Sequence, residues 1–180
     1  MVNKLKLLLK HLWLDASDTA RAIPPDMLDR LARRVAASER RHSGEIRICV
    51  ESSLPASYLW RLGSSHGLAA LTRERAVTLF GKFRVWDTEH NNGILIYLLL
   101  AEHAIEIVAD RGVARHVSPA QWLAMVAHMA SAFKEQRYED GLTQALEECS
   151  AVLMQHFALR DGAGGVQDAG NELPDAPQLQ

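Results

Sequence analysis

Two apolar runs of strand length lie close together near the middle of the chain, at residues 94–100 and 104–109. The first run is apolar throughout, as expected of a strand that is covered on both faces. Only residues 101–103 separate the two runs, and a connection this short cannot hold the crossover between parallel strands. We therefore predict an antiparallel hairpin, in which the start of the first strand lies beside the end of the second.

The spacing of apolar residues predicts the other elements as well. Residues 45–51 alternate between apolar and other side chains, which is typical of a strand with one strongly apolar side. Apolar stripes and capping residues predict helices that begin at Pro24, Thr72, Ser118 and Tyr138. These elements indicate an α/β fold over residues 21–158, with a small mixed β-sheet sandwiched between α-helices.

The stretch 52–71 contains Pro55, Gly63 and Gly67 and is predicted to be a long loop. Its apolar residues give two alternatives. The loop is a lid or a docking segment for a partner, or its aromatic side chains pack on the core.

Residues 1–20 form a separate N-terminal segment with an amphipathic helix. This helix packs on its own domain or on a second copy, or it contacts a membrane surface weakly. It carries no cleavage pattern and is too short to span a membrane. Its apolar face is Leu5, Leu8, Leu9, Leu12 and Trp13, and its polar face is Lys4, Lys6, Lys10 and His11.

Charge and cysteine content exclude several classes of protein. The chain has 180 residues and a formal net charge of −2, which is too balanced for a general nucleic-acid binder. Neither Cys49 nor Cys149 belongs to a CxxC pair, so zinc and redox signatures are missing. Residues 159–180 are acidic and poor in apolar side chains, and we expect a disordered tail. The expected location is the cytoplasm, with peripheral contact at the inner membrane as a variant.

Polar residues cluster at both ends of the predicted hairpin, in residues 87–92 and at Asp110 and Arg111. The hairpin should bring the two clusters to one edge. Asp87, Asn91, Asn92 and Asp110 are candidate ligands for Ca²⁺ or Mg²⁺, since hard cations bind carboxylate and amide oxygens. The alternative is local turn chemistry, in which Asp and Asn side chains bond the nearby backbone. Asp110 and Arg111 form an ion pair or a helix cap, or Arg111 binds an anion.

Candidate catalytic residues come from the same edge. The chain has no Cys-x₅-Arg loop, Asp-x-Asp pair or phosphate-binding loop, so covalent catalysis has no evident nucleophile. A metal-bound water could attack a phosphate, with Asp87 and Asp110 as ligands and His90 as the acid or base. Arg111 completes this set of candidates.

The order of these motifs resembles the TPM domain family (TPM phosphatase-like domain), and specifically a short, soluble bacterial branch. The motifs are Trp86-Asp87-Thr88, Asn91-Asn92-Gly93, the apolar strand, Ala109-Asp110-Arg111-Gly112, the Trp122 helix and the closing helix, over roughly residues 23–157. The resemblance implies a Rossmann-like three-layer fold. It also implies two known associations of the family, acid phosphatase activity in plant members and divalent-cation binding in some others.

Two functions follow as expectations. The first is a non-catalytic module that binds a protein partner, in the assembly or maintenance of membrane-associated complexes, and is tuned by a divalent cation. By resemblance, a membrane-bound LemA-type protein is a plausible partner. The alternative is a weak divalent-cation-dependent acid phosphatase that hydrolyses phosphomonoesters.

Overall fold

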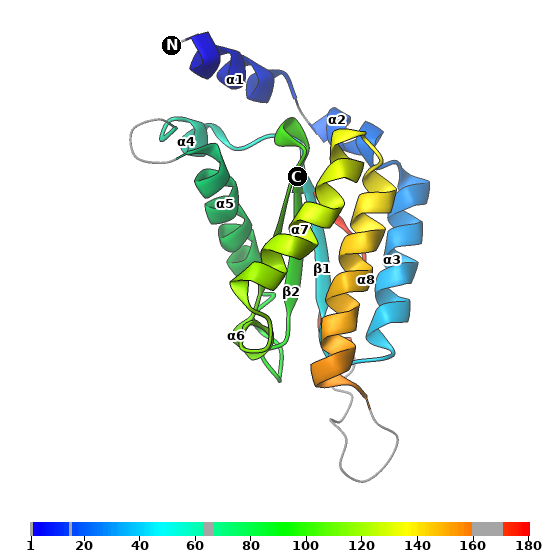
Figure 1. The fold of residues 1–180 in the computed structure, drawn as a ribbon. Helices are drawn as coiled ribbons and strands as arrows, with labels where there is room; N and C mark the ends of the chain where they lie inside the picture. The colour runs from blue at the N-terminus through cyan, green and yellow to red at the C-terminus, as the bar shows by residue number, and fades with distance from the viewer. Residues whose placement is uncertain (1, 15, 63–66, 160–170) are drawn as a thin grey trace.

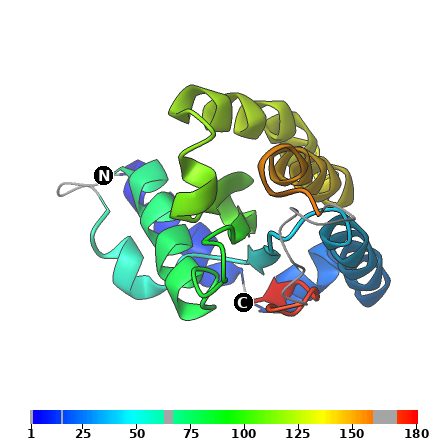
Figure 2. The ribbon, with the colours of Figure 1, turned by 90° about the horizontal axis from the view of Figure 1, so that it is seen from below.

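The computed structural model describes residues 2–14, 16–62, 67–159 and 171–180. A four-stranded mixed sheet lies between two layers of helices, which confirms the predicted α/β class (Figures 1 and 2). The strands are β1 (Ile46–Glu51), β2 (Ile94–Leu99), β3 (Ala104–Ala109) and β4 (Gln178–Leu179). The helices are α1 (Val2–Trp13), α2 (Ala16–Ala22), α3 (Pro25–Glu39), α4 (Ala56–Leu59), α5 (Leu68–Lys82), the 3-10 turn η1 (Leu100–Glu102), α6 (Arg111–Ala114), α7 (Pro119–Lys134) and α8 (Tyr138–Phe157).

The strand order is β3-β2-β1-β4. The β2–β3 pair is the predicted antiparallel hairpin, with Ile94 opposite Ala109. β1 runs parallel to β2, with Ile46 beside Ile94, because α4 and α5 supply the crossover that parallel strands require. The residues that precede β1 and β2 and the residues that follow β3 therefore meet at one end of the sheet.

Each face of the sheet has its own apolar core. Ile48 and Ile96 point toward the layer that contains α3, α7 and α8, and Leu95 and Tyr97 point toward the layer of α5. All six residues of β1 and all six of β2 are buried. The continuous apolar pattern of 94–100 thus reflects a strand covered on both sides.

The tail contradicts the predicted disorder over its last ten residues. Residues 171–180 lie along the free side of β1, where β4 pairs in parallel and the Gln180 amide donates to the Val50 oxygen at 2.9 Å. Leu173 is buried, and the Arg47 guanidinium donates to the Pro174 carbonyl oxygen. The edge of β1 offers unpaired backbone groups, and pairing with them compensates for the few apolar side chains of the segment. Residues 160–170 of the predicted tail lie outside the described residues.

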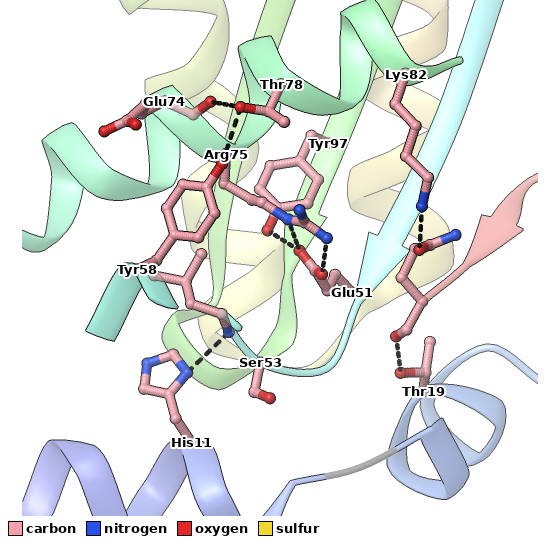
Figure 3. A network of polar contacts seen from close by, with 12 residues as sticks. His11, Thr19, Glu51, Ser53, Tyr58, Glu74, Arg75, Thr78, Lys82 and Tyr97 are labelled. Carbon is pink, nitrogen blue, oxygen red and sulfur yellow. Dashed lines mark hydrogen bonds and ion pairs between the residues drawn. The ribbon is translucent and has the colours of Figure 1, made fainter. Parts of the chain in front are cut away.

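Helix α1 packs on its own domain, through a face that differs only in part from the predicted one. Leu8, of the predicted apolar face, packs with Leu7 against the core on the α5 side. His11, placed on the polar face above, is buried, and its Nδ1 accepts from the Leu54 amide at 3.1 Å (Figure 3). Its Nε2 lies 3.3 Å from the Glu102 carboxylate. Leu9, Leu12 and Trp13 are exposed instead. The Glu102 carboxylate and the Leu54 amide compensate for burial of the His11 imidazole. The pattern of apolar residues along the sequence does not reveal such partners. The side chains of Lys4 and Leu5 lie outside the described residues.

The predicted long loop at 52–71 is partly helical. α4 occupies its first half and α5 begins at Leu68, four residues before the predicted Thr72. Leu59 and Leu62 are buried in the core on the α5 side, whereas Trp60 is exposed. Residues 63–66 lie outside the described part of this stretch. None of the helices in the described residues is long and apolar enough to cross a membrane.

Candidate functional site

The two predicted polar clusters do meet, at the end of the sheet where β2 begins and β3 ends. We call residues 87–92 together with 110–112 the polar edge. The Gly112 amide donates to the Asn91 oxygen at 2.9 Å, and the Asp110 amide donates to the Gly93 oxygen at 2.9 Å. These bonds extend the β2–β3 ladder into the two loops.

Asn91 links the loop before β2 to the start of α6. Its backbone has a φ of 53°, a left-handed conformation that Asn tolerates better than most residues. Its side-chain Oδ1 accepts from Arg111 Nη2 at 3.1 Å. A Cβ on Gly112 would lie 2.4 Å from the Asn91 oxygen and 2.7 Å from the His90 oxygen, so this approach requires glycine.

Asn92 is fully buried and anchors the loop from below. Its backbone N–H donates to the Thr88 hydroxyl at 3.0 Å. Its side-chain Nδ2 donates to the Ser43 carbonyl at 3.0 Å and to the Ser43 hydroxyl at 3.2 Å. Its Oδ1 is buried and accepts no hydrogen bond from the described residues. The loop therefore keeps one unsatisfied acceptor oxygen beneath the polar edge.

The two carboxylate oxygens of Asp110 also differ in their hydrogen bonds. Oδ1 accepts from the Arg111 amide at 2.6 Å and caps α6, and it lies 3.8 Å from Arg111 Nε. Oδ2 is buried and has no donor among the described residues. The helix cap and the ion pair, two of the interactions expected for Asp110 and Arg111, are thus both present.

Asp87 stands apart from this group. Its carboxylate pairs with the guanidinium of Arg84, three residues earlier, and is largely exposed. The hydrogen bonds described above join Arg111 to Asn91 and to Asp110, and they join Asn92 to Thr88 and Ser43, but they do not include Asp87. His90 contributes a buried Nε2 without a partner in the described structure. With Asn91, Arg111, Gly112 and Arg115, His90 lines a cavity of about 250 Å³.

A family model described as the TPM domain matches residues 16–152. This chain belongs to the TPM domain family. No curated protein matches it. Among solved structures, the BA42 protein of the psychrophilic bacterium Bizionia argentinensis is similar, with a TM-score of 0.69 and 21% identity over 88% of this chain and 95% of that one. The N-terminal domain of a protein from P. gingivalis gives a TM-score of 0.56 and 15% identity over 82% of this chain and 95% of that domain. Identities this low show a shared fold alone.

The polar edge of this TPM domain supplies only some of the oxygen ligands that a cation would need. The unpaired oxygens Asp110 Oδ2 and Asn92 Oδ1 suit Ca²⁺ or Mg²⁺, and both cations take about six or more oxygens. The Asp87 carboxylate is paired with Arg84, and Asn91 Oδ1 is bonded to Arg111. In the described residues, no three His, Cys, Asp or Glu side chains gather as a metal-binding group. A cation here would keep many water ligands.

The cysteines of the TPM domain offer no reactive thiol. Cys49 lies within β1 and Cys149 within α8, and both are buried. Burial raises the pKa of the Cys49 thiol to about 12 and raises the pKa of Cys149 as well. A thiol is a nucleophile as its thiolate, so neither cysteine is activated.

The sequence reasoning did not place Ser43 beside the polar edge. This residue is identified by a partner far away in the chain, Asn92. The signal for Ser43 was present in its position directly before a predicted strand. Once β1 and β2 are known to be parallel neighbours, their preceding loops must lie side by side.

A second polar group, also missed, lies at the other end of β1. Glu51 accepts from Arg75 Nη2 at 2.6 Å and from the Tyr97 hydroxyl at 2.7 Å, and all three side chains come from different elements (Figure 3). Burial raises the pKa of the Tyr97 hydroxyl, and the Glu51 charge adds to this effect. Both carboxylate oxygens of Glu51 accept from the Arg75 guanidinium, so the group is a buried structural ion pair.

Proposed function

We propose that this TPM domain is a non-catalytic module that binds a protein partner at the polar edge. Trp86 is the observation that carries the proposal: it is 50% exposed and directly precedes Asp87. Tryptophan is enriched in the energetic centres of protein interfaces because it buries a large apolar area. Beside Trp86, the ion pair of Arg84 and Asp87 adds a charged rim.

A divalent cation tunes this surface. Asp110 Oδ2 and Asn92 Oδ1 are its protein oxygens, supported by their burial without a donor in the described structure. With one carboxylate in the set, Ca²⁺ or Mg²⁺ would bind weakly. The bound ion would neutralise Asp110 and fix the loop that carries Trp86.

The partner is membrane-associated, and a LemA-type protein is the candidate that the family resemblance suggests. The domain then acts in the assembly or maintenance of a membrane-associated complex from the cytoplasmic side. Leu12 and Trp13 of α1 are exposed and could add a weak contact with the membrane surface.

Calorimetric titration of Ca²⁺ and Mg²⁺ into chelator-treated protein tests the cation. Binding should be saturable in the wild type, lost in Asp110→Asn and kept in Asp87→Asn, because Asp87 is held by Arg84. Equal binding by Asp110→Asn and the wild type would refute the site.

Binding to the LemA-type protein of the same organism tests the module. It should be lost in Trp86→Ala and retained in Trp60→Ala, a matched exposed tryptophan elsewhere on the surface. Loss in both variants, or in neither, would contradict the proposed surface.

One observation favours the alternative, a weak divalent-cation-dependent acid phosphatase. The cavity of about 250 Å³ is lined by Arg111, Arg115 and His90, and guanidinium groups suit a phosphate. In that case hydrolysis of p-nitrophenyl phosphate would require the cation and would disappear in Asp110→Asn while the fold remains. Hydrolysis that persists in this variant would exclude catalysis at the polar edge.

A further inference from the structure

Strand β3 forms an edge of the sheet, and no strand of the described residues pairs with the backbone groups on its outward side. The Asp110 amide donates to the Gly93 oxygen across the β2–β3 pair. In an antiparallel ladder the bonded pairs recur every second residue, so Val108 and Glu106 also bond to β2. The N–H and C=O groups of the alternate residues Ile105, Ile107 and Ala109 therefore point away from the sheet.

A groove of about 510 Å³ runs along this edge, between α5 and α7. Its lining is mainly apolar, and Leu123 is 71% exposed. Apolar side chains at an open groove stay in contact with water unless a partner covers them. The residues that matter for docking are Ile107, Ala109, Val117, Trp122, Leu123 and Val126.

Arg73 occupies the outward side of β3, where the backbone of a partner strand would form hydrogen bonds. Its Nη1 donates to the outward oxygen of Ile107 at 2.5 Å and pairs with the Glu106 carboxylate at 3.2 Å. The guanidinium thus occupies the position that the N–H of an added strand would take. Charged side chains often protect sheet edges in this way. Since the Arg73 side chain is half exposed, it can turn outward and pair with an acidic group of the incoming segment.

The other edge of the same sheet already binds an extended segment. There, the Gln180 amide donates to the Val50 oxygen at 2.9 Å and the Ser52 amide donates to the Gln180 oxygen at 3.3 Å. Leu173 provides a buried apolar anchor a few residues earlier. Backbone pairing, a buried leucine and side-chain bonds from Glu45 and Arg47 hold this segment of the chain on the sheet.

We propose that the β3 edge binds an extended segment of a protein partner as an added strand. Alternate side chains of the segment are apolar and enter the groove between α5 and α7, and a carboxylate pairs with Arg73. Backbone bonds to Ile107 and Ala109 provide affinity, and the groove selects the side chains. The proposal rests on the proposed function as an interaction module, and it names a second surface, between α5 and α7, which adjoins the polar edge where β3 ends.

Selection of short random peptides displayed on phage against the full chain supplies the probe. The best peptide is then measured against Ala109→Pro, which removes an outward N–H without breaking the ladder to β2, and against Ala109→Ser, which keeps it. We expect about tenfold weaker binding by Ala109→Pro and nearly unchanged binding by Ala109→Ser. The amides of Ile105 and Ile107 should gain protection from hydrogen exchange when the peptide is bound.

Leu123→Asp is a second variant for the case that Ala109→Pro does not fold. It changes an exposed side chain of the groove and should also weaken binding about tenfold, while Leu12→Asp on α1 should not. Absence of any enriched peptide, or a peptide insensitive to both groove variants, would overturn the proposal. A wild-type dimer that dissociates in Ala109→Pro would overturn it too, because the occupant would be a second copy.

The two proposals fail in different ways. If binding of the LemA-type protein is lost in Trp86→Ala while peptide binding is unchanged in the groove variants, the proposal for the groove fails and the proposed function of the polar edge is retained. If peptides bind the groove but no partner depends on Trp86, the proposed function of the polar edge fails alone.

Discussion

The side-chain amide of Asn92 donates to the backbone oxygen of Ser43 at 3.0 Å, across two segments that are 49 residues apart in the chain. Ser43 lies just before β1 and Asn92 just before β2. This bond fixes the two loops at the start of the parallel pair, and it holds the polar edge at that end of the sheet.

Asn92→Ala should therefore destabilise the fold. It removes two hydrogen bonds to Ser43 and leaves a buried carbonyl without its donor, which costs about 1–3 kcal/mol. Urea denaturation measures the change. Gln155→Ala, an exposed amide on α8, is the control and should change the free energy of unfolding by less than about 0.5 kcal/mol. Similar values for the two variants would mean that the Asn92 bonds contribute little.

Gly112→Ala should destabilise the polar edge because its Cβ would lie 2.4 Å from the Asn91 oxygen, and backbone must move. A loss of about 1–3 kcal/mol is expected. Gly81→Ala is the matched control: nothing lies within 4 Å of its Cβ, and alanine within α5 should stabilise the helix by about 0.5–1 kcal/mol. Thermal melts of both variants measure the difference. A Gly112→Ala variant as stable as the wild type would show that the backbone at His90 and Asn91 moves at little cost in free energy.

The docked C-terminal segment should make stability depend on pH through Glu39. Burial raises the pKa of the Glu39 carboxyl to about 9, and the charges of Glu45 and Asp175 act in the same direction. The folded state therefore binds this proton more tightly than the unfolded state. The contribution is complete below about pH 4.5 and is lost as pH rises toward 9, at less than about 1.4 kcal/mol per pH unit.

Glu39→Gln tests this assignment, since glutamine keeps an oxygen for the Ile46 amide and carries no charge. Urea midpoints between pH 5 and 9 should fall less steeply for the variant than for the wild type. Parallel profiles would assign the pH dependence to other groups, of which Glu45 is the first candidate, because burial raises its pKa to about 6.

Leu173→Ala should release the C-terminal segment before the rest of the domain unfolds. Leu173 is the buried apolar anchor of residues 171–180, and truncation of such a side chain costs about 2–5 kcal/mol when its site is well packed. Hydrogen exchange at the Gln180 amide should become faster, while the exchange at Ile96 changes little. Leu12→Ala, an exposed leucine on α1, is the control. Unchanged exchange at Gln180 would assign the docking to the hydrogen bonds of the segment, those of Arg47 and Glu45 included.

The hairpin could be predicted because its evidence is local: two apolar runs and a connection that permits one topology. Its consequence, the meeting of Asn91 with Arg111, followed from the same reasoning. β4 could not be predicted, since Gln178 and Leu179 carry no strand pattern and pair because β1 offers a free edge. His11 was misplaced for a similar reason, as its partners Leu54 and Glu102 come close only in the folded chain.

Parallel pairing of β1 and β2 places Glu51 beside Leu99, seven positions along the chain from Asn92 at the polar edge. At about 3.3 Å per residue, roughly 23 Å of strand separates the two groups, which is well beyond the separation of about 10 Å past which substitutions usually act independently. Substitutions at Glu51 and at Asp110 should consequently be additive in free energy. Either group can therefore be altered in an engineered variant without retuning the other.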